Sequence, residues 1–159
     1  MMPPLRIALV HYHLRPGGVT SVLARTVSAL AAHPVRVVVL CGDAAAAGKS
    51  FPCPVQLVPG LDYGEGGGNL ADELLRAASE TLGGPPDVWH IHNHSIGKNA
   101  ALPRAVAQLA RNGARLLLQL HDFAEDGRPE NYQRLRGGAE SLYPAGSRAH
   151  YALLNQRDR

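Results

Sequence analysis

Short runs that are apolar at nearly every position recur along the chain, with polar loops between them. Such runs are typical of strands that are buried on both faces of a parallel sheet. The strands predicted in this way are Leu5–Val10, Val35–Cys41, Val55–Val58, Asp87–His92, Leu116–Leu120 and Ala149–Leu154.

Three segments between these strands have the periodicity of amphipathic helices, and a polar segment from Asp122 to Gly138 is predicted to hold one helical turn near Tyr132. Thr20 or Ser21 is available to cap the first helix, and Asn69 is predicted to cap the second. The alternation of strand and helix predicts a doubly wound, parallel α/β sheet. The three helices are Thr20–Ala32, Ala71–Leu82 and Ala100–Arg111.

The composition places the chain among ordinary globular proteins. Its 159 residues are 45% hydrophobic and 18% charged, which suits one domain over residues 1–159 and argues against disorder. The net charge of +3 comes from scattered arginines, without the basic patch or motif that indicates nucleic-acid binding. Cys41 and Cys53 form no disulfide framework or familiar metal pair, and no signal peptide or membrane span is recognisable. We therefore expect a reducing, cytoplasmic setting.

The stretch DVWHIHNHS, from Asp87 to Ser95, has a histidine at every second position. In an extended segment, the side chains of His90, His92 and His94 would all project from one face. Such a row could bind a metal, line a substrate cleft or form a polar strand end.

Six of the eight histidines lie in or directly after the carboxyl ends of three predicted strands. Parallel strands bring these ends to one edge of the sheet, which is where open α/β sheets bind ligands. The pattern predicts a functional cleft at this edge. The six are His11, His13, His90, His92, His94 and His121.

Different functions compete for these histidines. His90 lies inside its strand and is expected to be a packed, hydrogen-bonded core residue. HIHNHS is similar to the HxHxDH pattern of binuclear metallohydrolases but lacks its aspartate, so we expect no metal site here. His121 and Asp122 form the stronger catalytic candidate, because a carboxylate beside an imidazole at a strand end can hold one tautomer.

A glycine pair precedes the first predicted helix in the segment RPGGVTSVL. Two glycines before a helix N-terminus let the backbone approach an anion, and the free N–H groups favour phosphate. The segment is neither GxGxxG nor a P-loop, and a tight turn without a ligand remains the alternative.

Taken together, four segments resemble the amino-terminal half of GT-B glycosyltransferases, most closely the retaining family 4. They are LRIALVHYHLRPGGVTSVL, DVWHIHN, LLLQLHDF and HYALLNQRD, which follow one another in the order typical of that family. The resemblance implies a Rossmann-like fold and transfer of a sugar from a nucleotide-sugar donor to an acceptor hydroxyl with retention. It implies no metal cofactor, in keeping with the absence of a DxD motif.

The resemblance also implies roles for individual residues. Gly17, Gly18 and Thr20 would approach the donor diphosphate, and His121 with Asp122 would lie at the reacting centre. The acceptor would be bound by the residues His13, His92, Asn93, Glu125, Asp126 and Arg128.

GT-B enzymes have a second, donor-binding domain, and the sequence shows no counterpart of it. We therefore expect the chain to be an N-terminal acceptor domain that is inactive alone. The alternatives are a metal-dependent hydrolase that uses His90, His92, His94 and His121, and a non-catalytic flavodoxin-like binding module. The sequence also leaves open peripheral membrane contact and self-association through the exposed strand edge.

Overall fold

A computed structural model describes residues 3–45, 51–136 and 142–156. In this part of the chain, six strands form one sheet in the order β3-β2-β1-β4-β5-β6, and all neighbours are parallel. The strands are β1 (Leu5–Val10), β2 (Val35–Cys41), β3 (Val55–Leu57), β4 (Val88–His92), β5 (Leu116–Leu120) and β6 (Ala149–Leu153).

This strand order is that of a doubly wound, Rossmann-like sheet and confirms the predicted fold class. The chain leaves β1 toward β2 on one side and later returns to place β4 on the other side of β1. A flavodoxin-like sheet has the order 2-1-3-4-5 instead, so the flavodoxin-like topology in the alternative reading is wrong.

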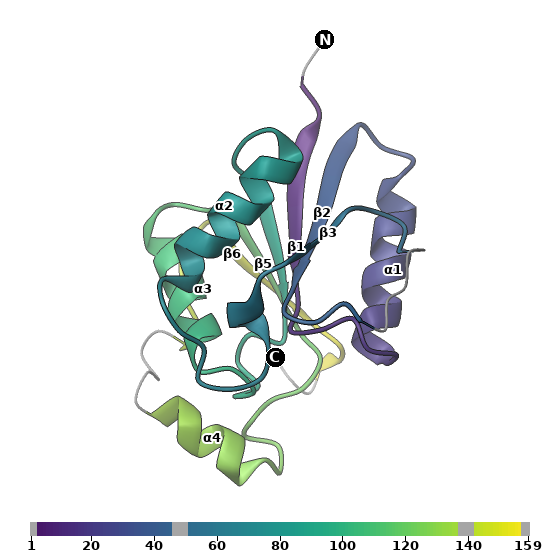
Figure 1. Cartoon of the computed structure of the whole chain (residues 1–159). Helices are drawn as coiled ribbons and strands as arrows, with labels where there is room; N and C mark the ends of the chain where they lie inside the picture. The colour runs from purple at the N-terminus through teal and green to yellow at the C-terminus, as the bar shows by residue number, and fades with distance from the viewer. Residues whose placement is uncertain (1–2, 46–50, 137–141, 157–159) are drawn as a thin grey trace.

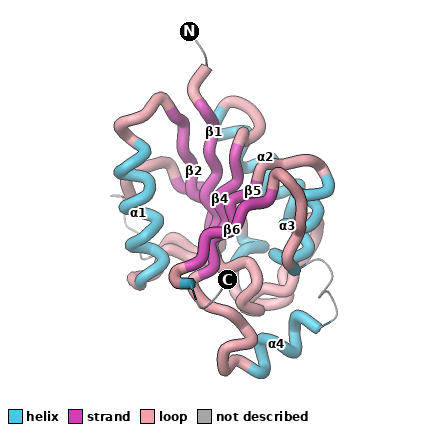
Figure 2. The backbone as a smooth tube through the Cα atoms, turned by 180° about the vertical axis from the view of Figure 1, so that it is seen from behind, coloured by secondary structure: helices cyan, strands magenta, loops and turns pink. Residues whose placement is uncertain are grey.

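Helices cover the two faces of the sheet (Figures 1 and 2). On one face, Leu23 and Val27 of α1 pack against Ile7 and Leu9 of β1. On the other face, α2 and α3 bury the larger core, which includes Trp89. Alternate residues of the strands point to the two cores, which explains their nearly continuous apolar sequences. The helices are α1 (Gly18–Leu30), α2 (Leu70–Leu82) and α3 (Ala101–Arg111).

The predicted caps have different outcomes. Asn69 caps α2 as predicted, because its side chain accepts a hydrogen bond from the N–H of Asp72. The prediction for α1 was wrong: the helix begins at Gly18 and its N-cap is Gly17, which has no side chain. The hydroxyls of Thr20 and Ser21 therefore lie inside the first turn, where they donate to the carbonyls of Arg15 and Gly17.

The segment after β5 contains α4 (Pro129–Leu135), which is longer than the single turn predicted near Tyr132. The last two residues of that predicted segment, 137–138, lie outside the described residues. Figure 1 shows α4 beyond the carboxyl edge of the sheet, away from the helical layers. The short 3₁₀ helix η2 (Pro59–Leu61) follows β3. None of the described helices has the length and apolar character needed to cross a membrane.

Candidate active site

A cleft of about 300 Å³ lies at the carboxyl ends of β1, β4 and β5. It includes the point between β1 and β4 where the strand order changes direction, which is where open parallel sheets bind ligands. A larger hollow of about 480 Å³, lined by Pro3, Pro4 and Asp87 among others, lies at the opposite edge. The fold therefore favours the first cleft as the functional site.

The cleft brings together most of the residues singled out in the sequence. Seven of the predicted site residues line it: His13, Gly17, Gly18, Thr20, Asn93, Asp122 and Arg128. Four others are not part of its lining: His92, His121, Glu125 and Asp126.

The glycine pair forms one wall of the cleft. The first N–H bonded within α1 is that of Ser21, to the carbonyl of Gly17, so the amides before it are free of helical partners. An added Cβ would meet nothing within 4 Å at Gly18, and only the Arg15 carbonyl oxygen, at 3.9 Å, at Gly17. Gly17 has an extended backbone (φ 170°, ψ 175°), and neither residue lies in the left-handed region that favours glycine. The fold itself makes no demand for glycine here, whereas close approach of an anion to the backbone would.

Asn93 connects the ends of β4 and β5. It has a left-handed backbone (φ 53°), the only positive φ of a non-glycine residue among the described residues. Its Oδ1 accepts hydrogen bonds from the N–H groups of His121 (2.7 Å) and Asp122 (3.3 Å). Its carbonyl accepts a hydrogen bond of 2.6 Å from the buried hydroxyl of Tyr12. Asn93 thus positions the His121-Asp122 pair relative to β4.

The three imidazoles of DVWHIHNHS do not share one face, so that expectation was wrong for His94. His90 and His92 do lie together, with ring centroids 4.3 Å apart. The left-handed turn at Asn93 breaks the alternation, and Nε2 of the buried His94 donates instead to the carbonyl of Leu142, 2.7 Å away. His90 is buried and lies 2.8 Å from Oε1 of Gln119, as expected of a core histidine.

His92 is fully buried behind the cleft, and its Nδ1 lies 3.0 Å from Nε2 of His121. Burial, reinforced by repulsion from three neighbouring imidazoles, lowers the pKa of His92 to about 2. Burial also lowers the pKa of His121, against the opposing effect of the Asp122 carboxylate. Both rings are therefore neutral at pH 7, and one proton is shared between the two facing nitrogens.

The environment of His92 decides which ring donates. Nε2 of His92 is buried and has no hydrogen-bond partner among the described residues. A buried N–H without an acceptor costs more than an unused lone pair, so the proton of His92 belongs on Nδ1. His92 then donates to Nε2 of His121, and His121 carries its own proton on Nδ1.

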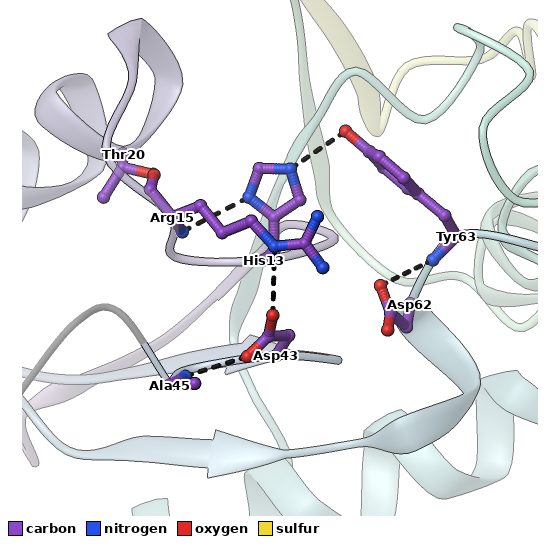
Figure 3. Close-up of polar contacts among 7 residues, drawn as sticks. All are labelled: His13, Arg15, Thr20, Asp43, Ala45, Asp62 and Tyr63. Atoms are coloured by element: carbon purple, nitrogen blue, oxygen red, sulfur yellow. Dashed lines mark hydrogen bonds and ion pairs between the residues drawn. The ribbon is translucent and has the colours of Figure 1, made fainter.

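On the other wall, His13, Arg15 and Tyr63 form a polar network (Figure 3). Nδ1 of His13 accepts a hydrogen bond of 3.3 Å from the N–H of Arg15, and its Nε2 lies 2.9 Å from the Tyr63 hydroxyl. Nε of Arg15 donates to a carboxylate oxygen of Asp43 at 3.0 Å. A backbone bridge between His13 and Asp43 connects the segments that follow β1 and β2.

Only part of the loop after β5 lines the cleft. Asp122 lines the cleft and lies 3.5 Å from Nη2 of Arg128. Nη1 of Arg128 donates to the carbonyl of Phe123. Glu125 accepts a hydrogen bond of 3.4 Å from Tyr143, outside the cleft.

Each of the three imidazoles of DVWHIHNHS has one ring nitrogen engaged with another residue of the protein. His90 contacts Gln119, His94 donates to a carbonyl and Nδ1 of His92 faces His121. Within residues 3–45, 51–136 and 142–156, no group of three or more His, Cys, Asp or Glu side chains is placed to share a metal ion. The geometry does not favour the hydrolase alternative.

The structure adds residues that the sequence analysis did not single out. Arg15 and Lys98 line the cleft. Both lie in loops that follow predicted strands, so their place in the sequence could have marked them as candidate site residues. Tyr63 also lines the cleft, but it lies in the loop after β3 and η2, where no pattern in the sequence marks it.

Comparison with known protein families gives a match over most of the chain. The family model described as glycosyl transferase 4-like domain matches residues 17–159. The chain belongs to this glycosyltransferase family.

Two other similarities were found. The mannosylglucosyl-3-phosphoglycerate synthase of Petrotoga mobilis is 28% identical over 165 residues, which cover 94% of this chain and 32% of that enzyme. This chain thus spans about a third of the length of that relative. A chain of the PhuZ201 filament structure aligns with 96% of this chain and 49% of its own length, at 16% identity and a TM-score of 0.47. The second similarity is too weak to carry an argument.

Proposed function

We propose that this glycosyltransferase domain is the acceptor-binding, N-terminal half of a two-domain GT-B enzyme. The whole enzyme would transfer a sugar from a nucleotide-sugar donor to an acceptor hydroxyl with retention of configuration. The observation that carries the proposal is the cleft at the β1/β4 switch point. There the N-terminus of α1, with Gly17 and Gly18, lies beside the ends of β4 and β5.

The reaction we propose is a front-face displacement. The bond between the anomeric carbon and the donor phosphate oxygen breaks, while the acceptor hydroxyl oxygen bonds to the same face of that carbon. The hydroxyl proton passes to the departing phosphate oxygen, which accounts for all atoms and charges. No divalent metal is required, because the free amides before Ser21 in α1 would stabilise the phosphate.

His121 is not part of the cleft lining, but it is only half-buried and is adjacent to Asp122, which lines the cleft. It would act as a hydrogen-bond donor to a hydroxyl of the transferred sugar. The tautomer argued above leaves its Nδ1–H available, and its neutral state avoids repulsion with the positive charge that develops on the sugar ring. Asp122, whose carboxylate lines the cleft, would stabilise that charge. His13, Asn93 and Arg128 would bind the acceptor.

The decisive test is to assay the 159-residue chain and the proposed two-domain enzyme that would contain it (called the longer protein below) in parallel against a panel of nucleotide sugars. We expect transfer by the longer protein with EDTA present, and none by the chain alone. The anomeric coupling constant of the product, measured by ¹H NMR, should show the configuration of the donor. Robust transfer by the chain alone would contradict the two-domain account, and an inverted product would contradict retention.

A variant of the longer protein separates the enzyme from a non-catalytic binding module. His121→Ala should reduce kcat strongly while the protein remains folded, and Glu125→Ala, outside the cleft, should not. Unchanged activity and binding in His121→Ala would favour the binding module.

A further inference from the structure

The cleft carries an excess of positive charge. Three cationic side chains line it, namely Arg15, Lys98 and Arg128, against the single carboxylate of Asp122. Arg128 lies 3.5 Å from Asp122, and Arg15 is paired with Asp43 at 3.0 Å. Lys98 has no carboxylate partner among the described residues. An anionic ligand would supply the missing negative charge.

Two of these cations gather at one aromatic ring. Nζ of Lys98 lies 5.3 Å from the centroid of the Tyr63 ring, and Cζ of Arg15 lies 6.0 Å from it. The face of an aromatic ring attracts cations, but it carries no charge that would neutralise two of them. Asp43 already offsets the charge of Arg15, so the charge left unpaired at this ring is that of Lys98, and a bound anion would offset it.

The Tyr63 hydroxyl adds a third donor. Nδ1 of His13 accepts the N–H of Arg15, so a neutral His13 carries its proton on Nε2 and donates it to the Tyr63 oxygen (Figure 3). Burial lowers the pKa of His13 and raises the pKa of Tyr63, which keeps both groups in these neutral forms. The hydroxyl hydrogen of Tyr63 remains free to donate into the cleft.

Lys98 and Tyr63 are held in place together. The N–H of Gly64 donates to the carbonyl of Lys98 at 2.9 Å, and Gly64 also forms a bridge with Asn99. The Asn99 side chain is fully buried, and its Nδ2 donates to the carbonyls of Gly60 (2.8 Å) and Asp62 (2.6 Å).

The other end of Asn99 fixes the same loop to α3. Its Oδ1 accepts hydrogen bonds from the N–H groups of Ala101 (2.8 Å) and Leu102 (2.9 Å). These N–H groups belong to the first turn of α3 and have no acceptor within the helix. The loops that carry Tyr63 and Lys98 are therefore preorganised before any ligand binds, which lowers the entropic cost of binding.

We propose that Lys98, Arg15 and Tyr63 form a subsite for the phosphate or carboxylate group of an anionic sugar acceptor. The assignment of this group to the acceptor rests on the function proposed above, whereas the binding of an anion at Lys98 does not depend on that function. Lys98 follows β4, on a segment separate from the Gly17-Gly18 backbone that is proposed to receive the donor phosphate. Arg15 belongs to the same loop as Gly17 and Gly18, so the proposal of a second place for an anion, on the acceptor side, rests on Lys98 and Tyr63.

The first test measures binding to the 159-residue chain directly. Glucose 6-phosphate, glucuronate and glucose are titrated at constant ionic strength and followed by isothermal calorimetry and NMR. We expect both acids to bind and glucose to bind at least about tenfold more weakly, as a lost charged hydrogen bond implies. Equal affinity for glucose and its phosphate would overturn the proposal.

A matched pair of variants locates the site. Lys98→Gln should weaken glucose 6-phosphate binding about tenfold. Arg115→Gln removes one positive charge at the opposite edge of the sheet and should leave binding unchanged. Equal losses in the two variants would mean a general effect of net charge and would overturn the subsite. Circular dichroism of both variants checks that neither has unfolded.

Kinetics of the longer protein then distinguish the two anions. Lys98→Gln should raise the KM for an anionic acceptor and leave the KM for the nucleotide sugar unchanged. A raised donor KM alone would mean that Lys98 binds the donor diphosphate, and the acceptor assignment would fall. If the chain binds glucose 6-phosphate through Lys98 but the longer protein transfers no sugar, the proposed function fails while the anion site stands. If the longer protein transfers sugar but Lys98→Gln does not weaken the binding of glucose 6-phosphate, the anion site fails while the proposed function stands.

Discussion

Nδ1 of His92 and Nε2 of His121 lie 3.0 Å apart, joining the ends of two neighbouring strands through a single shared proton. His92 is fully buried, so its tautomer is set by the protein rather than by solvent. Through this contact, a residue that does not reach the cleft decides which nitrogen of His121 carries a proton.

Histidine ¹⁵N NMR of the chain tests this relationship. We expect His121 to be protonated on Nδ1 and His92 on Nδ1 as well, with His92 remaining neutral to pH 4 because burial lowers its pKa to about 2. A proton on Nε2 of His121 would reverse the direction of the hydrogen bond and remove the proposed donor.

Variants at His92 test whether the contact matters for transfer. The amide of His92→Asn can occupy the position of Nδ1, whereas His92→Leu fills the volume but cannot donate. In the longer protein we expect His92→Leu to lower kcat by up to about 100-fold through misplacement of His121, and His92→Asn to retain most of the rate. The pH profile of kcat should shift only in the leucine variant, and equal rates would show that His92 has a merely structural role.

The left-handed Asn93 makes a second prediction, about stability. Asn93→Gly loses the Oδ1 acceptor but tolerates φ 53°, whereas Asn93→Ala loses the acceptor and strains the backbone. We expect the alanine variant to be less stable than the glycine variant by about 1–2 kcal/mol in urea denaturation. Asn112→Ala, at an ordinary φ of −78°, is the control and should change stability by less than about 0.5 kcal/mol. Equal stability of the two Asn93 variants would refute backbone strain at this position.

The glycine pair predicts opposite effects on stability and on function. Gly18→Ala meets no atom within 4 Å and should stabilise the chain by about 0.4–1 kcal/mol, since alanine restricts the unfolded state. In the longer protein, the same methyl group should raise the donor KM, because it would stand where the phosphate approaches the backbone. Gly113→Ala, at φ +79° and far from the cleft, should destabilise the chain without affecting the donor KM. An unchanged donor KM in Gly18→Ala would argue against phosphate at this loop.

The buried histidines predict loss of stability in mild acid. Burial lowers the pKa of His11 and His94 to about 4 and that of His92 to about 2, from an ordinary value of 6.5. Between pH 6.5 and 4 the unfolded chain therefore binds more protons than the folded chain, so stability falls as the pH falls. At pH 5 the loss should be roughly 2 kcal/mol for each of the three imidazoles.

Urea denaturation at pH 7.5 and pH 5.0 checks this dependence. The amide of His94→Gln can still donate to the carbonyl of Leu142 but does not titrate, so the difference between the two pH values should shrink. His150→Gln, at an exposed histidine, should leave the difference unchanged. An undiminished pH dependence in His94→Gln would show that this imidazole is already protonated, or accessible, in the folded chain.

Much of the fold could be predicted because its signals are local. Continuous apolar runs such as Val35–Cys41 can be buried only between two layers, and the helical periodicity between them supplies those layers. The topology brought the ends of β1, β4 and β5 to one edge. Placing His13, Asn93 and Asp122 in one cleft therefore required no knowledge of side-chain geometry.

The sequence by itself determined which strand ends carry polar side chains, and hence where the cleft lies. Only the tertiary structure decided which of those side chains face the cleft. One backbone angle at Asn93 turns His94 into the core, and burial places His92 behind His121. Tyr63 comes beside Lys98 through hydrogen bonds of Asn99 to residues nearly 40 positions away in the chain. Such contacts depend on distances across the fold, and periodicity along the chain carries no information about them.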